Sequence, residues 1–210
     1  MSKDPRKGLS EKVVSFKKLR ILFVGNSYSF GVPNAFARTM AANGRRVKIG
    51  NSTFGGWTLA QHSKFDGTLK KLRSREWDVI VFQEHSLIPA RLPKKREAEM
   101  FPPLRILVTE ARNHGAVPVL YQTWGRRDGA SELKNDTFFA MTARLRQGYQ
   151  AAAKNAGGVT VVPVGAAWER EMMAGRGAVL FNEDGSHPTA AGDALTAETF
   201  YQTLYPTSGR

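Results

Sequence analysis

Three polar residues near opposite ends of the chain have the side-chain types that act together in nucleophilic catalysis. Ser27 follows the apolar run 21–24, and Asp184 and His187 stand three positions apart near the end of the sequence. A serine hydroxyl is a weak nucleophile until a histidine accepts its proton, and a carboxylate keeps that imidazole in the required tautomer. We therefore treat Ser27 as a candidate nucleophile, His187 as its general base and Asp184 as the acid that orients His187.

Attack by a serine on an acyl carbonyl creates an oxyanion, which needs hydrogen-bond donors already in place. The backbone N–H groups of Ser27 and Gly56 and the side-chain amide of Gln83 are the candidates. Each also has a plain structural interpretation: Ser27 as a helix cap, Gly56 as a turn glycine and Gln83 as a buried amide that ties loops together. In the same way, His187 could merely begin the last helix and Asp184 could form a turn.

The elements that must position these residues are predicted from hydrophobic periodicity. Short apolar runs predict strands at 21–24, 47–49, 77–82, 116–121 and 159–164, with the second at an edge of the sheet. Apolar residues at helical spacing predict helices at about 33–42, 59–72, 97–113, 135–155, 166–173 and 190–204. Strands that alternate with helices in this way form a parallel sheet with helices on both faces.

The candidate residues all come soon after predicted strands. Ser27 follows the first strand, Gly56 the second, Gln83 the third and Trp124 the fourth, and the segment 184–187 comes after the fifth. The carboxyl ends of parallel strands share one edge of the sheet, where open α/β folds bind their ligands. We therefore expect these residues to converge although they are far apart in sequence.

Length and composition indicate one globular domain. The 210 residues are 41% hydrophobic and 23% charged, as is typical of such domains. We expect a single domain over residues 20–205, preceded by a basic, mostly mobile leader over residues 1–19. The absence of cysteine excludes disulfides, thiolate catalysis and cysteine-ligated zinc. No apolar run approaches the ~18–20 residues of a membrane-spanning helix, and no secretory signal is evident, so we expect a cytoplasmic protein.

The formal net charge of +13 is high for a domain of this size. Such a charge can attract nucleic acid, an anionic membrane surface or acidic substrates. The basic residues are dispersed along the chain and are not interleaved with aromatic residues in an RNA-binding pattern, so we expect no nucleic-acid partner. The basic residues at 91–96 and 126–127 hint at an anionic substrate instead.

Taken together, the motifs resemble those of the SGNH hydrolases, also called GDSL-type lipases and esterases. The family's Gly-Asp-Ser-Leu block corresponds to Gly25-Asn26-Ser27-Tyr28-Ser29, and its Asp-x-x-His block to Asp184-Gly185-Ser186-His187. Its oxyanion glycine corresponds to Gly56, with Gly55 as the second choice, and its Gly-x-Asn-Asp block to Val81-Phe82-Gln83-Glu84. Two residues depart from the family pattern, since Asn26 replaces an acidic residue and Gln83 replaces the asparagine.

The resemblance covers residues 20–204 and implies the SGNH hydrolase fold. This fold is a three-layer α/β/α sandwich around a five-stranded parallel sheet in the flavodoxin-like order 2-1-3-4-5. The order of the blocks differs from that of the α/β-hydrolases, where the nucleophile block lies mid-chain and the acid comes well before the histidine. The Gln-Glu pair indicates a branch that lacks the usual Asn-Asp block.

The activity that the resemblance implies is hydrolysis of an acyl ester by Ser27, His187 and Asp184. The substrate would be a small-molecule acyl ester or an acylated sugar, and we expect no cofactor and no metal. The candidate substrate-lining residues are Trp57, Glu84, Trp124 and Arg126. Each also has a structural interpretation. The two tryptophans could equally pack in the core, Arg126 could be a solvated charge, and Glu84 could have a structural role in its loop.

Two other functions remain open from the sequence. An acyltransferase would use the same site, with a sugar or alcohol in place of water as the acceptor. A catalytically silent relative would keep the fold and use its charge to bind nucleic acid or an anionic surface.

Overall fold

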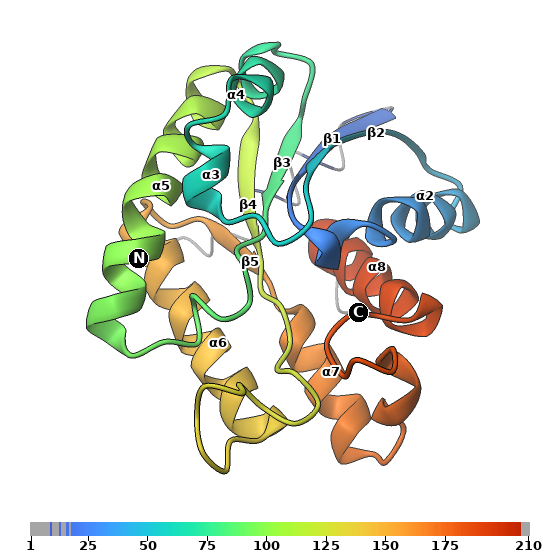
Figure 1. Ribbon diagram of the computed structural model, residues 1–210. Helices are drawn as coiled ribbons and strands as arrows, with labels where there is room; N and C mark the ends of the chain where they lie inside the picture. The colour runs from blue at the N-terminus through green and yellow to red at the C-terminus, as the bar shows by residue number, and fades with distance from the viewer. Residues whose placement is uncertain (1–8, 10–12, 14–15, 17, 207–210) are drawn as a thin grey trace, which may run out of the picture.

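The computed structural model of the protein describes residues 18–206 together with Leu9, Val13 and Phe16 (Figure 1). Five strands form one sheet in the order β2-β1-β3-β4-β5, and all neighbouring strands are parallel. The strands are β1 (Lys18–Gly25), β2 (Arg46–Thr53), β3 (Val79–Phe82), β4 (Val117–Tyr121) and β5 (Thr160–Val162). The predicted parallel sheet, its strand order and the edge position of the second strand are confirmed.

Helices cover both faces of this sheet, which gives the predicted three-layer sandwich (Figure 1). On one face lie α2 (Val32–Ala42), α7 (Val164–Met173) and α8 (Ala190–Leu204). On the other lie α3 (Leu59–His62), α4 (Asp66–Arg73), α5 (Pro93–Asn113) and α6 (Phe138–Asn155). Two short 3-10 helices complete the described part, η1 (Ser27–Ser29) and η2 (Gly177–Leu180).

The alternation of side chains along β1 explains why helices pack on both faces. Ile21 and Phe23 belong to one apolar core, with α2 and α8, whereas Leu22 and Val24 belong to the other, with α3 and α5. All four side chains are fully buried. A strand that is apolar on both faces can be satisfied only inside a parallel sheet covered twice, so this short run determines the architecture.

The helix predicted over 59–72 is wrong, because the chain forms two helices there. A Thr58–Gln61 capping box begins α3, which ends after one turn at His62. Phe65 is then extended, with φ −92° and ψ 115°, and precedes α4. The interruption lets the His62 imidazole turn inward and bond to the Gly25 carbonyl oxygen at 2.9 Å.

Two other boundaries differ because of prolines. The fifth strand ends at Val162, not 164, because Pro163 has no N–H to donate to a ladder and instead precedes α7. Helix α5 begins at Pro93, four positions before the predicted start, since proline is favoured in a first helical turn.

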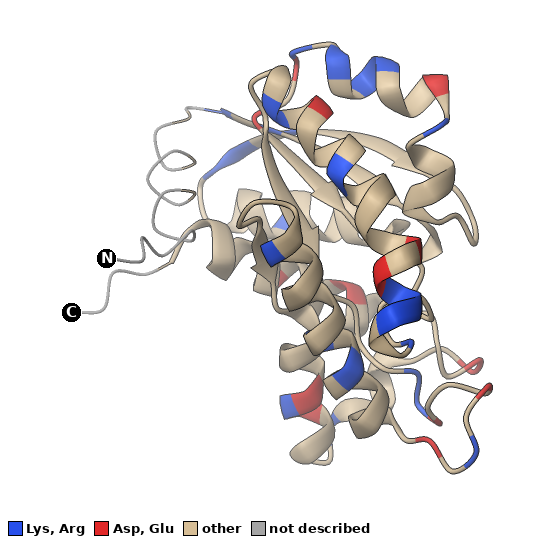
Figure 2. Cartoon of the chain, turned by 90° about the vertical axis from the view of Figure 1, so that its left-hand side faces the viewer, with Lys and Arg blue, Asp and Glu red and all other residues tan. Residues whose placement is uncertain are grey.

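Most of the predicted leader lies outside the described residues. Of residues 1–19, Leu9 and Val13 are buried against the core shared with α2 and α8, and Lys18 and Leu19 already belong to β1. Figure 2 shows Lys and Arg on several elements, interspersed with Asp and Glu. Within the described part, no helix combines the length and apolarity that crossing a membrane requires.

Candidate active site

The structure brings Ser27, His187 and Asp184 together at the carboxyl edge of the sheet. The Ser27 Oγ atom lies 2.8 Å from Nε2 of His187, and the other ring nitrogen, Nδ1, is hydrogen-bonded to Oδ2 of Asp184. The hydroxyl, imidazole and carboxylate are therefore connected in the order that proton transfer from a serine requires. About 160 residues separate the two halves of this set in sequence.

Ser27 is positioned by the turn that begins at Gly25, the last residue of β1. A Cβ atom at Gly25 would lie 2.5 Å from Oε1 of Gln83 and 2.9 Å from its Cβ, so the position has no room for a side chain. The Gly25 carbonyl oxygen accepts hydrogen bonds from Nε2 of His62 and from the backbone of Phe54. The backbone before Ser27 is thus held by contacts to the loop after β2 and to α3.

Asn26 also holds the backbone around Ser27. Its Oδ1 accepts the Tyr28 N–H at 3.2 Å and so caps η1, and its Nδ2 donates to the Trp57 carbonyl oxygen at 2.9 Å. From the sequence, Asn26 stood out only as a replacement for an acidic residue. Its type is nevertheless a signal, because asparagine is a preferred helix N-cap.

His187 and Asp184 are held in place by a tight turn. Gly185 adopts a φ of +64°, which glycine tolerates without a Cβ clash. Oδ1 of Asp184 accepts the Ser186 N–H at 2.8 Å and the His187 N–H at 2.9 Å, while Oδ2 is left for the ring. Burial alone would raise the pKa of Asp184, but these hydrogen bonds outweigh it and lower the pKa to about 2. The carboxylate therefore stays ionised at neutral pH.

Three stacked aromatic rings pack against this turn. The rings of Tyr28 and Trp124 stack at 4.9 Å, and those of Trp124 and Trp168 at 3.8 Å. Nε1 of Trp124 donates to the Ser186 carbonyl oxygen at 3.1 Å, and the Tyr28 hydroxyl is 2.5 Å from Oγ of Ser186. Trp124 is fully buried. Its predicted contact with substrate is thus wrong, and it packs against the turn that carries Asp184 and His187.

The two backbone N–H groups predicted as oxyanion donors have no hydrogen-bond acceptor among the described residues. Ser27 begins η1, where the first N–H groups have no intrahelical partner. Gly56 is exposed and adopts a φ of +71° in the loop after β2, and within the described part nothing accepts a hydrogen bond from its N–H. A left-handed glycine can orient its N–H where other residues could not.

Gln83 has a different role from the predicted one. Its side chain is fully buried, its Oε1 accepts the Asn26 N–H at 2.9 Å and the Ser29 hydroxyl at 3.1 Å, and its Nε2 donates to the Glu84 carbonyl oxygen at 2.7 Å. The amide therefore joins the β1 and β3 loops and does not face the site. This arrangement matches the structural alternative considered for Gln83.

Glu84 is likewise wholly buried, so its predicted contact with substrate is wrong. Oε1 accepts the Leu59 N–H at 3.1 Å and the His85 N–H at 2.7 Å. It thus joins the start of α3, three residues after Gly56, to the loop after β3. Burial raises the pKa of Glu84 to about 7, although both N–H groups oppose the shift.

The other two predicted substrate-lining residues are half-buried. The Trp57 ring packs 4.3 Å from the ring of Phe54, between the Gly56 loop and α3. Arg126 follows β4 and lies beside His85 closely enough for its charge to lower the pKa of that imidazole, in addition to the larger effect of burial.

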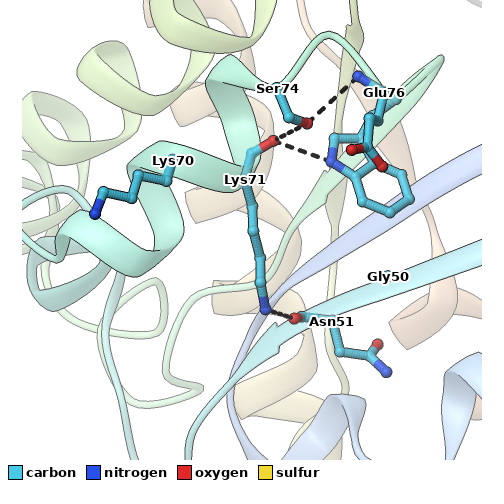
Figure 3. Close-up of a pocket in the computed structure, with 7 residues that line it drawn as sticks. Gly50, Asn51, Lys70, Lys71, Ser74 and Glu76 are labelled. Carbon is cyan, nitrogen blue, oxygen red and sulfur yellow. Dashed lines mark hydrogen bonds between the residues drawn. The ribbon is translucent and has the colours of Figure 1, made fainter.

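A separate surface pocket of about 350 Å³ lies between β2 and α4 (Figure 3). The Lys71 ammonium donates to the Asn51 carbonyl oxygen at 2.5 Å, and Nε1 of Trp77 donates to the Lys71 carbonyl oxygen at 3.0 Å. Glu76 is paired with Lys48. The polar groups of this pocket bond mainly to the protein itself, and none of the triad residues lines it.

Comparison with known proteins gives structural matches only. No protein-family model matches the chain, and no curated protein matches it. A DUF4886 family protein from Bacteroides uniformis superposes with a TM-score of 0.77 at 21% identity, over 92% of this chain and 88% of that one. An acetylxylan esterase from Geobacillus stearothermophilus superposes with a TM-score of 0.67 at 17% identity, over 91% of this chain and 96% of that one. A putative GDSL-like lipase from Parabacteroides merdae superposes with a TM-score of 0.66 at 18% identity, over 91% of this chain and 98% of that one.

These matches extend over nearly the whole chain, although the sequence of each differs greatly from that of this protein. At identities this low, the similarity lies in the arrangement of the strands and helices. Together with the observed strand order and the position of the Ser27 turn at the end of β1, they show that this chain has the fold of the SGNH hydrolases.

Proposed function

We propose that the protein is a serine hydrolase that cleaves acyl esters. The observation that carries this proposal is the connected set of Ser27 Oγ, the His187 ring and the Asp184 carboxylate, with 2.8 Å between Oγ and Nε2. An SGNH fold with a putative lipase and an acetylxylan esterase among its structural neighbours supports the same reaction class.

In this mechanism, Oγ of Ser27 attacks the acyl carbonyl carbon while His187 accepts the hydroxyl proton. The carbonyl oxygen becomes an oxyanion, which the N–H groups of Ser27 and Gly56 stabilise. The tetrahedral intermediate then collapses, the C–O bond to the alcohol breaks, and His187 gives its proton to the departing oxygen. Water then attacks the carbonyl carbon of the acyl-serine while His187 accepts its proton. The bond to Oγ breaks, Ser27 regains its proton from His187, and the acid is released.

The oxyanion site in this proposal differs from the one predicted by sequence. Gln83 is engaged in three hydrogen bonds to other groups, so we assign stabilisation to the two backbone donors alone. The substrate class is a small-molecule ester, of which an acylated sugar is one form.

Labelling with a fluorophosphonate probe tests the proposal, because such probes react only with activated serines. The wild type is expected to be labelled at Ser27, whereas Ser27→Ala and His187→Ala are not. Circular dichroism of each variant serves as the folding control. A folded wild type that resists labelling, or a Ser27→Ala variant that is labelled as fast as wild type, would refute it.

A further inference from the structure

Arg126 is a half-buried cation whose charge is not neutralised within the described part of the chain. Its Nε atom is buried and has no hydrogen-bond partner, and among the described residues no carboxylate forms an ion pair with its guanidinium. Arg144, by comparison, is paired with Asp136 at 2.6 Å. Removing a charge from water is costly unless an opposite charge or hydrogen-bond acceptors compensate. The guanidinium of Arg126 is therefore available to pair with an anion from outside the chain.

The contacts of neighbouring residues place Arg126 beside the catalytic turn. Two positions before it, Nε1 of Trp124 donates to the Ser186 carbonyl oxygen at 3.1 Å. One position after it, the Arg127 N–H donates to the Gly185 carbonyl oxygen at 2.7 Å. The segment that carries Arg126 is thus bonded at both ends to the turn between Asp184 and His187. Arg91 and Arg96 also have a buried, unpartnered Nε. Arg91, however, is paired with Glu99, and within the described residues no hydrogen bond joins Arg96 or the residues next to it to this turn.

On its other side, Arg126 lies next to the loop after β3. After burial, the charges of Arg126 and Arg91 are the main reasons why the pKa of His85 is lowered, and Glu132 opposes them only weakly. Arg91 is already paired with Glu99. Arg126 therefore supplies the uncompensated positive charge at this edge of the site, between the loops after β3 and β4.

We propose that Arg126 binds an anionic group, such as a carboxylate, on the ester that Ser27 cleaves. This inference rests on the proposed function and extends it by naming the substrate class. A guanidinium presents planar paired donors that match a carboxylate or another oxyanion, and a partly desolvated site strengthens such a bond. Burial of Nε leaves the outer guanidinium nitrogens as the groups that meet the ligand.

Two matched pairs of esters test this assignment and locate the anion. On the alcohol side, para-acetoxybenzoate is compared with its methyl ester, and on the acyl side the para-nitrophenyl half-ester of succinate is compared with its methyl ester. For at least one pair, Arg126→Ala is expected to lower kcat/KM for the anionic member by about 10- to 100-fold, the range for a lost charge-assisted hydrogen bond. The neutral members should change by less than about twofold, and Arg126→Lys should recover part of the loss.

Arg46→Ala is the matched control, because Arg46 is exposed at the amino end of β2, at the opposite edge of the sheet. It removes the same charge, so it reports any effect of net charge alone. Equal losses for neutral and anionic esters in Arg126→Ala, or equal losses in Arg46→Ala, would overturn the assignment to Arg126.

A binding measurement separates this inference from the proposed function. Calorimetry with para-acetoxybenzoate uses the Ser27→Ala protein with and without Arg126→Ala, so it requires no turnover. Binding that is lost with Arg126 supports the anion site even if fluorophosphonate does not label the wild type. Normal labelling together with binding and turnover that ignore Arg126 would refute the anion site and leave the hydrolase intact.

Discussion

Replacement of Glu84 by glutamine should change how the stability of the protein depends on pH. Glu84 is fully buried between the Gly56 loop and the loop after β3. Glutamine preserves the Oε1 atom that accepts the N–H groups of Leu59 and His85, but it cannot ionise. The variant therefore removes the proton equilibrium at this position and keeps the two hydrogen bonds.

The expected magnitude follows from the pKa of Glu84, which burial raises from 4.5 to about 7. Between these two values the folded protein keeps a proton that the unfolded chain loses, so the free energy of unfolding falls as the pH rises. At about 1.4 kcal/mol for each pKa unit, the full penalty is about 3 kcal/mol and is complete above pH 7. The difference in free energy of unfolding between Glu84→Gln and wild type should thus rise by about 2–3 kcal/mol, in favour of the variant, when the pH is raised from 5 to 8.

Urea denaturation of both proteins at pH 5 and pH 8 measures this change. The quantity of interest is the difference in free energy of unfolding between variant and wild type, in which all other titrating groups cancel. This difference is also expected to contain a term that does not depend on pH, because the new amide nitrogen replaces Oε2, an oxygen without a hydrogen-bond partner. Glu97→Gln, on the exposed side of α5, is the control. A Glu84→Gln offset that is the same at both pH values would refute the reasoning.

Two further substitutions test how the site is built. Gly25→Ala should lower the free energy of unfolding by about 1–3 kcal/mol, because its Cβ would lie 2.5 Å from Oε1 of Gln83; urea denaturation measures this, and an unchanged midpoint would contradict it. Asp184→Asn should lower kcat on para-nitrophenyl acetate by about three to four orders of magnitude, because an amide favours the wrong tautomer of His187. Since the pKa of Asp184 is about 2, protonation of Asp184 should not cause any loss of wild-type activity between pH 7 and pH 4.

The sequence predicted the fold well because its strands are buried on both faces. The run Ile21–Val24 has no polar position at all, so its only satisfactory location is a parallel sheet covered twice. The buried strand β3 follows the same rule, whereas the edge strand β2 is polar and mostly exposed or half-buried. Helix boundaries were less predictable, because periodicity alone does not reveal that His62 turns inward to bond to the Gly25 carbonyl oxygen. That bond is a tertiary contact, and it interrupts an otherwise continuous apolar stripe.

For the site, residue types predicted that the side chains of Ser27, His187 and Asp184 would lie together, as they do. They did not show which polar groups are already engaged in other contacts. Ser27 directly follows β1, whereas His187 lies in the loop between η2 and α8, so strand position alone accounts for Ser27 but not for His187. Trp124 and Glu84 were plausible lining residues by the same rule and are instead buried beneath the loops. Position at a strand end indicates proximity to a site, whereas exposure to substrate depends on side-chain packing.

The replacement at Gln83 illustrates this distinction. From β3, the longer side chain reaches back over Gly25 and accepts both the Asn26 N–H and the Ser29 hydroxyl, which an asparagine one methylene shorter could not do from the same backbone. The contact requires a glycine at position 25, and it holds the residues on both sides of Ser27. Gln83 therefore stabilises the nucleophile's turn. In the proposed mechanism, oxyanion stabilisation is then assigned to the exposed Gly56 N–H and the Ser27 N–H, so that mechanism depends more on the loop after β2 than the family pattern alone implies.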